Sequence, residues 1–200
     1  MTDADKRDRI IAAAYEVLSK KGYDRASTKE IAATAGVAQG LINYYFPSKD
    51  LLFAEVFRQE TERYCHSFHV ELNQAMPEEP LNKGTIAKLL EVPKNRVIDE
   101  PDWFRLRYEL FAIGLRNEAA RPILKEMLNT KTEYIAESIR PLLPLPKEQT
   151  GALASILHGV FEGLALQKIA DPEFNYEEAY ATLAQMLGAY YVAMCEKRES

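Results

Sequence analysis

The chain has 200 residues, of which 47% are hydrophobic and 28% are charged, and its formal net charge is −5. This composition is typical of a globular protein and excludes disordered and fibrous classes. No run of about 18 apolar residues occurs and residues 1–9 lack an apolar signal core, so we expect a cytoplasmic protein without a membrane partner.

Helical periodicity dominates the chain from its beginning. The first expected helix is amphipathic and ends near Gly22. Ser27 and Glu30 match a capping box, in which the serine caps a second helix and the glutamate reaches back to the serine amide. This helix is expected to run to about Ala35, because Gly36 is placed for the left-handed turn that ends many helices.

A third, very short helix is expected over residues 38–45, where Pro47 ends it. Ser48 caps a long fourth helix that extends towards Leu72, and the MPEEP segment at residues 76–80 is expected to be a loop. Further helices are expected at about residues 85–92, 102–116, 122–139, 148–169 and 176–197. No run alternates with period two, so the predicted fold class is all-α.

The second and third expected helices have the pattern of a helix-turn-helix, in which two short helices flank a glycine turn. The two helices are expected to cross closely at position 32, which requires a small residue such as Ala32. Apolar residues such as Ile42 can fill the small core between them. The residues left facing outward on the third helix are Gln39, Gly40, Asn43 and Tyr44.

This outward set suits a recognition helix in the DNA major groove. Glutamine and asparagine can pair with adenine, and Gly40 allows a close backbone approach. Side chains suited to phosphates are Thr28, Lys29, Tyr44, Tyr45 and Lys49. Residues 1–58 hold nine Lys/Arg and eight Asp/Glu, so the acidity lies in the remainder and a local basic face is permitted. From spacing alone, an ordinary helical hairpin with solvated polar tips is the alternative.

The segment TKEIAATAGVAQGLINYYFPSKDLLFAEVF resembles the DNA-binding segment of TetR-type transcriptional regulators, and the resemblance covers about Arg9–Phe57. It implies an all-α homodimer that usually represses transcription and is released from operator DNA by a small molecule. We expect no cofactor. Residues 1–47 would form the DNA-binding domain and residues 48–200 the ligand-binding and dimerisation domain, linked by a helix at 48–73. By position it assigns DNA contacts to Thr28, Gln39, Gly40, Asn43, Tyr44, Tyr45 and Lys49.

The two C-terminal helices are expected to form a dimer interface. Glycines inside the helix at 148–169 lower its stability, which suggests that another helix approaches closely. The residues expected at the interface are Ile156, Gly159, Val160, Gly163, Leu187 and Tyr191. The alternative is that both helices belong to the internal core.

A pocket for a largely apolar effector is expected among the middle helices, since small-molecule sites are mostly apolar with few polar groups. The candidate lining residues are Tyr64, Phe68, Trp103, Arg107, Tyr108, Phe111 and Gln167. Aromatic residues at helical spacing are also common in ordinary cores, so this alternative stays open.

The CHSFH segment raises a metal hypothesis, because His66 and His69 can share a helix face with Glu62 one turn earlier. No di-iron Glu-x-x-His pattern, CxxC, GxSxG or HExxH motif accompanies it, so we expect neither a metal site nor an enzyme. Two alternatives to a ligand-responsive regulator are an all-α enzyme or metal carrier, and a helical module that binds protein.

Overall fold

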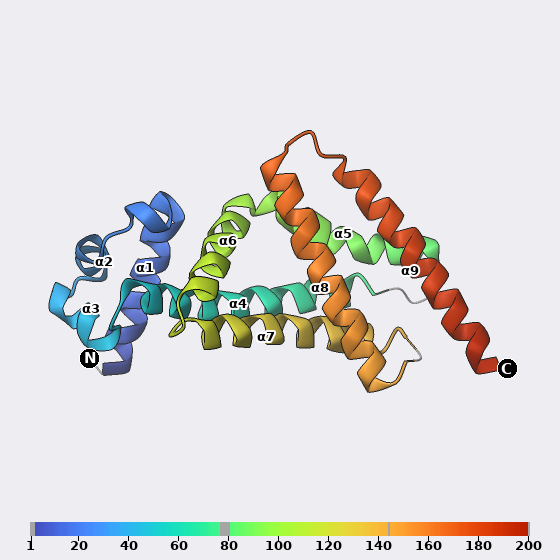
Figure 1. Cartoon of the computed structure of the whole chain (residues 1–200), viewed down its shortest axis with the longest axis horizontal. Helices are drawn as coiled ribbons and strands as arrows, with labels where there is room; N and C mark the ends of the chain where they lie inside the picture. Colours follow the sequence, from blue (N-terminus) through green and yellow to red (C-terminus); the bar gives the residue numbers. More distant parts are fainter. Residues whose placement is uncertain (1–2, 77–80, 144, 200) are drawn as a thin grey trace. The chain divides into compact units, whose positions relative to one another are not determined.

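The computed structural model describes residues 3–76, 81–143 and 145–199, and its regular secondary structure in these ranges is entirely helical (Figure 1). The helices are α1 (Asp3–Arg25), α2 (Thr28–Ala35), α3 (Gln39–Tyr45), α4 (Lys49–Gln74), α5 (Lys83–Asp99), α6 (Pro101–Arg116), α7 (Arg121–Ile139), α8 (Lys147–Ala170) and α9 (Tyr176–Glu199). The all-α prediction is confirmed. Most of the predicted loop at 76–80 lies outside the described residues. No described helix has the length and hydropathy to cross a bilayer.

The chain packs as two compact units. The first comprises residues 1–62 and 102–128, and the second comprises residues 63–101 and 129–200. α4 and α7 therefore each contribute to both units. The expected functional boundary after residue 47 is a division by role, and it stays a prediction.

The first unit is built around the apolar face of α1. Ile10, Ile11, Ala14, Val17 and Leu18 are buried, as the amphipathic pattern predicts. The helix is broken near its end at Gly22, whose φ of 72° and ψ of 174° are not helical. The predicted end near Gly22 thus corresponds to a kink, after which the chain makes one further turn.

The predicted capping box at the start of α2 is half formed. Ser27 Oγ accepts a hydrogen bond from the Glu30 amide at 3.2 Å, as expected. The Glu30 carboxylate instead lies 2.7 Å from Lys21 Nζ on α1. The Glu30 carboxylate was predicted to accept a hydrogen bond from the Ser27 amide, but it forms an ion pair with the preceding helix instead.

In the second unit, α5 continues through Pro93, which corrects the predicted end at residue 92. An internal proline costs a helix about 3 kcal/mol, so tertiary contacts must offset it. Lys94 and Arg96, both buried, supply such contacts just beyond the proline. Lys94 Nζ lies 2.8 Å from Glu177 Oε2 on α9, and Arg96 Nη2 lies 2.5 Å from Glu71 Oε1 on α4.

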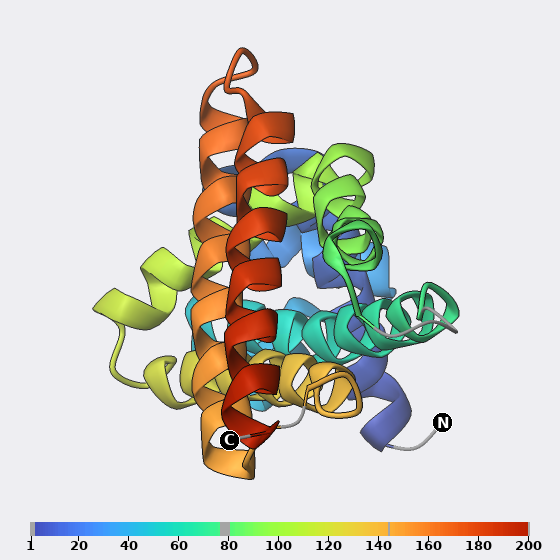
Figure 2. The same cartoon turned by 90° about the vertical axis from the view of Figure 1, so that its right-hand side faces the viewer.

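The last two helices belong wholly to the second unit. α8 leads to a short turn at residues 171–175, and α9 returns from it, so that they overlie each other in Figure 2. α5 packs against both. A core of buried residues from α4, α5, α7 and α8 includes Phe68, Leu89, Ile135 and Leu157.

Candidate DNA-binding surface and ligand cavity

Two consecutive short helices of the first unit, α2 and α3, form a helix-turn-helix beside α1 (Figure 1). Gly36 ends α2 in the left-handed region, with φ of 64° and ψ of 40°, a conformation that residues with a side chain adopt only with strain. The Val37 amide then donates to the Ala32 carbonyl at 3.0 Å. This closed turn fixes the direction in which α3 leaves α2.

α3 divides sharply between one buried anchor and an outward face. Ile42 is buried within the helix, as the sequence predicts, and Phe46 is buried at its C-terminal end. The four residues expected to face DNA are all exposed: Gln39, Gly40, Asn43 and Tyr44. Tyr44 is 74% exposed although it is a large aromatic side chain. An exposed polar and aromatic face on a buried anchor is suited to contacting the edges of bases.

The first turn of α2 lies next to the first turn of α3. Gln39 Nε2 donates a hydrogen bond to Thr28 Oγ1 at 3.3 Å. Thr28 is half-buried, whereas Lys29 is exposed. A candidate phosphate ligand and a candidate base-reading residue are therefore in direct contact.

The other two expected phosphate contacts, Tyr45 and Lys49, are less exposed. Tyr45 is half-buried, and its ring meets that of Tyr44 edge to face at 5.1 Å. Lys49 Nζ donates to the Tyr23 carbonyl at 2.5 Å and lies 4.3 Å from the centre of the Tyr23 ring. Its ammonium group must share or leave this carbonyl to reach a phosphate.

Tyr23, which was not predicted from the sequence to be important, makes hydrogen bonds to two other helices. Its amide donates to Glu109 Oε2 on α6 at 2.8 Å, and its hydroxyl donates to Asp50 on α4. Asn117 donates to the other Asp50 carboxylate oxygen at 2.7 Å. Burial, and then the Asp50 hydrogen bond, raise the pKa of Tyr23 to about 12. These contacts join the end of α1 to α4 and α6. In the sequence, Tyr23 is marked only by its place directly after Gly22, where the first amphipathic segment ends.

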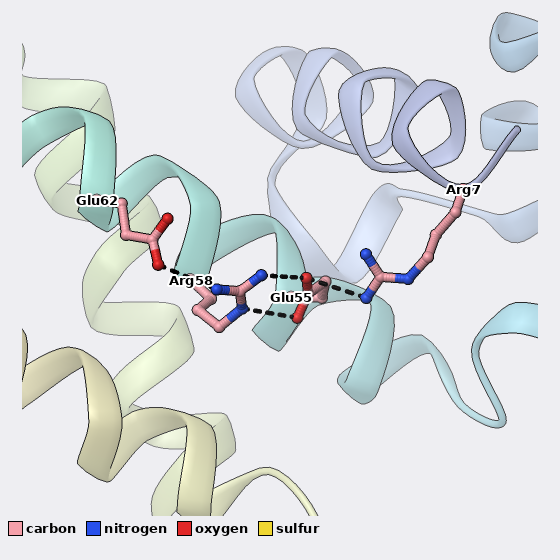
Figure 3. Close-up of polar contacts among 4 residues, drawn as sticks. All are labelled: Arg7, Glu55, Arg58 and Glu62. Atoms are coloured by element: carbon pink, nitrogen blue, oxygen red, sulfur yellow. Dashed lines mark hydrogen bonds and ion pairs between the residues drawn. The ribbon is translucent and has the colours of Figure 1, made fainter. Parts of the chain in front are cut away.

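A second polar network ties α1 to α4 within the same unit, as Figure 3 shows. Arg7 Nη2 lies 3.0 Å from Glu55 Oε1, and Arg58 Nη2 lies 2.8 Å from the same oxygen. Arg58 also reaches Glu62 at 3.0 Å. Burial opposes ionisation of Glu55, but hydrogen bonds from Arg58 and Arg7 outweigh it and hold the pKa of this carboxyl below its usual value.

The second unit contains an apolar cavity of about 90 Å³. Five helices, α4, α5, α7, α8 and α9, contribute to its wall. Its lining includes Phe68, Leu89, Ile135, Leu157, Phe161 and Leu187. Tyr190 and Tyr191 are the aromatic residues that α9 contributes. The volume is below the range of about 300–1,000 Å³ that is usual for drug-sized ligands, so such a ligand requires the walls to part.

Of the seven residues expected to bind a ligand, Phe68 lines this cavity. Tyr64 lies one turn before it on α4 and stacks under Arg96, whose guanidinium carbon is 4.5 Å from the ring centre. Gln167 is exposed on α8. The remaining four, Trp103, Arg107, Tyr108 and Phe111, lie on α6 in the first unit.

The α6 residues make ordinary core contacts. Trp103 stacks on Phe57 with ring centres 5.5 Å apart. The Arg107 guanidinium carbon lies 4.2 Å from the centre of the Phe104 ring. The core alternative, left open by the sequence, describes these contacts, and a ligand role for the four α6 residues stays a prediction.

The residues expected at a dimer interface separate into two groups. Ile156, Gly159, Val160 and Gly163 follow one another at helical spacing on α8, and Ile156 is 63% exposed. A Cβ atom added at Gly159 or Gly163 would meet open space, so no other described helix of this chain lies against the backbone there. Leu187 and Tyr191 on α9 instead line the cavity. The outward α9 residues that the sequence analysis did not select include Met186, which is 65% exposed.

Of the two histidines of the CHSFH segment, His69 takes part in helix packing. His69 Nδ1 lies 2.9 Å from Ser138 Oγ on α7, and His69 Nε2 lies 3.0 Å from Asn73 Nδ2. His66 is exposed, and Cys65 is buried. In the part of the chain that the structure describes, no three His, Cys, Asp or Glu residues are grouped so that they could hold a metal.

Comparison with known proteins relates this architecture to DNA-binding regulators. The family profile described as bacterial regulatory proteins, tetR family, matches residues 10–56. An uncharacterised HTH-type transcriptional regulator from the dhlA 5′ region of Xanthobacter autotrophicus is 28% identical over 173 residues, which cover 84% of this chain and 82% of that protein.

Further relatives extend the similarity. The HTH-type transcriptional regulator UidR of Escherichia coli K12 is 27% identical over 134 residues, which cover 67% of this chain and 64% of UidR. Among solved structures, the multidrug binding protein EbrR complexed with ethidium is 26% identical, with a TM-score of 0.70 over 92% of this chain and 99% of that chain. EbrR has also been solved complexed with proflavin, with a TM-score of 0.68.

Proposed function

We propose that this chain, which belongs to the TetR family of helix-turn-helix transcriptional regulators, is a dimeric repressor that a small molecule releases from its operator. The observation that carries the proposal is the outward face of α3. There, Gln39, Asn43 and Tyr44 are exposed around the single buried anchor Ile42.

DNA recognition follows from the chemistry of this face. Gln39 and Asn43 can each pair bidentately with an adenine edge, and Gly40 lets the helix backbone approach the groove. Thr28, Lys29 and Tyr44 contact phosphates that fix the position of the helix. In a dimer, two such helices about 34 Å apart enter successive major grooves of a near-palindromic site.

Two open features of the second unit support the remaining parts of the proposal. The stripe of α8 that contains the exposed Ile156 and Gly159 and the half-buried Gly163 is available to a second copy of the chain. The apolar cavity offers a place for an effector. An effector shifts the population towards a state with unsuitable recognition-helix spacing only if it binds that state more tightly.

The test is fluorescence anisotropy of the purified protein with DNA from immediately upstream of its own gene, titrated across salt concentrations. We expect saturable binding that competes out random DNA and weakens steeply with salt. Tyr44→Ala should weaken specific binding by about tenfold, because it removes an exposed contact without disturbing the buried anchor.

Leu115→Ala is the matched control, because Leu115 is 70% exposed on α6 of the same unit and lies outside the helix-turn-helix. It should leave DNA affinity unchanged. Equal affinity of the Tyr44 variant and the wild type would count against the DNA-facing role of α3. Binding of a protein partner by this face, with no preference among DNA sequences, would favour the interaction-module alternative.

A further inference from the structure

The core of the second unit encloses more space than its own side chains fill. The cavity between its helices has a volume of about 90 Å³. Protein interiors are otherwise close-packed, with few voids larger than one water molecule. A single water needs only about 10–15 Å³ of such space, so this cavity is several times larger than one water requires.

The wall of this cavity is almost entirely apolar. None of the lining residues that the structure describes carries a charge. The members that are also buried come from four different helices, and they include Phe68, Leu89, Ile135 and Leu157. A molecule inside the cavity therefore meets hydrocarbon on all of these sides.

Two tyrosines of α9 are the lining residues that have a polar atom in the side chain. Tyr190 is 37% exposed, so water can reach part of it. The Tyr191 hydroxyl shares a hydrogen bond with Cys195, one turn further along α9. Neither residue gives the wall more than a trace of polar surface.

This chemistry determines which occupant is favourable. A buried water needs about two to four polar partners, which the wall does not supply. An apolar molecule needs none, and it gains dispersion contacts with the side chains that surround it. Filling the cavity also removes the destabilising effect that an apolar void has on a fold.

Charge and size narrow the choice further. An ion buried against this wall would lose its hydration and find no opposite charge, which is strongly unfavourable. An engineered apolar cavity of about 150 Å³ in another protein stays dry and binds benzene. A volume of about 90 Å³ therefore suits a molecule with one ring, accommodated by small movements of the leucine side chains.

We propose that the effector is an uncharged hydrocarbon-like molecule with a single ring, bound in this cavity by shape and apolar contact without a hydrogen bond. This inference rests on the proposed ligand-responsive function. It separates this chain from EbrR, whose solved complexes contain ethidium and proflavin. Both dyes are cations with several fused rings, and this cavity has neither an opposite charge in its wall nor the volume for them.

The test compares probes of nearly equal shape with the full-length protein: ethylbenzene, benzyl alcohol, benzylammonium and benzoate. Binding is measured by calorimetry without DNA. We expect ethylbenzene to bind about tenfold more tightly than benzyl alcohol, because the wall does not satisfy the hydroxyl group. The two ions should bind at least about 100-fold more weakly than ethylbenzene.

A substitution inside the cavity shows where the probe binds. Leu157→Phe places a larger side chain in the space and should weaken ethylbenzene binding by about tenfold. Leu115→Phe is the matched control, because it makes the same change at a side chain that is 70% exposed in the first unit. It should leave ethylbenzene binding unchanged. Circular dichroism checks the fold, and Leu153→Phe, at another lining position of α8, replaces the Leu157 variant if that variant does not fold.

Four outcomes overturn the proposal. Ethylbenzene does not bind, or a charged probe binds as tightly as ethylbenzene. Benzyl alcohol binds more tightly than ethylbenzene, which would reveal a hydrogen-bonding partner in the wall. The cavity variant and the control bind ethylbenzene equally, which would place the probe elsewhere.

A separate DNA-release assay distinguishes this inference from the proposed function. If ethylbenzene binds in the cavity but does not release DNA, the ligand class stands and the proposed release mechanism fails. If a charged ligand releases DNA and the Leu157 variant responds normally, the release mechanism stands and the ligand class fails.

Discussion

The outward face of α3 and the open stripe of α8 are both uncovered in this chain, but their chemistry is opposite. The α3 face presents Gln39, Asn43 and Tyr44, which can hydrogen-bond to bases and phosphates. The α8 stripe presents Ile156 and two glycines, which offer shape and apolar area but few hydrogen bonds. A polar face suits a polyanion, whereas an apolar face of this kind suits another protein surface.

The two faces also differ in what lies behind them. Hydrogen bonds and ion pairs of polar side chains, among them Asp50 and Glu55 of α4, connect the helices that support α3. The inner side of α8 instead lines the cavity through Leu157 and Phe161, which lie about 200° around the helix from Gly159 and Gly163. A ligand in the cavity would therefore press on the helix whose other side we propose to meet the partner. The difference suggests that polar contacts hold α3 in a fixed position, whereas α8 can change its position when a ligand enters the cavity.

The largest expected effect comes from placing a charge on the α8 stripe. Ile156→Asp should convert a dimer into monomers, because an unpaired carboxylate at the centre of an apolar interface costs several kcal/mol. The side chain is 63% exposed in the protomer, so folding should be unaffected. Light scattering measures the mass, and circular dichroism checks the fold.

Gly163→Leu tests the same surface by size rather than charge. The added Cβ atom meets open space within the chain, and leucine has a higher helix propensity than glycine, so the protomer should be at least as stable. It should nevertheless yield monomers, because it prevents close approach of a partner helix. Leu115→Asp, on an exposed α6 position, is the control and should stay dimeric. Intact dimers in both α8 variants would refute the proposed interface and the contrast drawn from it.

The sequence was sufficient for the parts of the structure that depend on local patterns. The helix-turn-helix followed from Ser27, Gly36 and Pro47, whose roles depend on their own backbone geometry. The exposed face of α3 followed from its single apolar anchor, Ile42. Such features are readable because neighbours along the chain determine them.

The parts that the sequence did not reveal depend on residues far apart in the chain. Pro93 predicts a helix end, but Lys94 and Arg96 meet carboxylates on α9 and α4 that no local pattern shows. Residues of five helices line the cavity. Spacing along the chain therefore could not show that Leu157 lines it and that Trp103 does not.

A smaller effect is expected from Lys49, and it tests whether the α3 face extends to the start of α4. Lys49→Met should reduce the slope of log affinity against log salt by about 0.9 if this ammonium neutralises one phosphate. The control is Lys20→Met, whose ammonium pairs with Glu16 on exposed α1 surface. If the slope is unchanged and only the melting temperature falls, Lys49 serves the Tyr23 carbonyl and not DNA.

The smallest effect concerns Glu55, which tests whether the support behind α3 is as fixed as the structure shows. Its folded-state pKa is held below its usual value of 4.5, mainly by Arg58 and Arg7 against the effect of burial. Ionised Glu55 therefore stabilises the fold above about pH 4.5, and this contribution disappears as the pH falls through the folded-state pKa. Glu55→Gln should lower stability at pH 7 and make the decline in acid shallower, by at most about 1.4 kcal/mol per pH unit.

Urea unfolding at several pH values between 3 and 7 measures this difference. Glu16→Gln is the control, because Glu16 forms an exposed pair with Lys20 within one helix and should change the pH slope very little. If the Glu55 and Glu16 variants have the same slope, the Arg7–Glu55–Arg58 network is not maintained in solution. The helices behind α3 would then lack these fixed polar contacts, as α8 does. The two faces would differ only in the chemistry of their exposed residues.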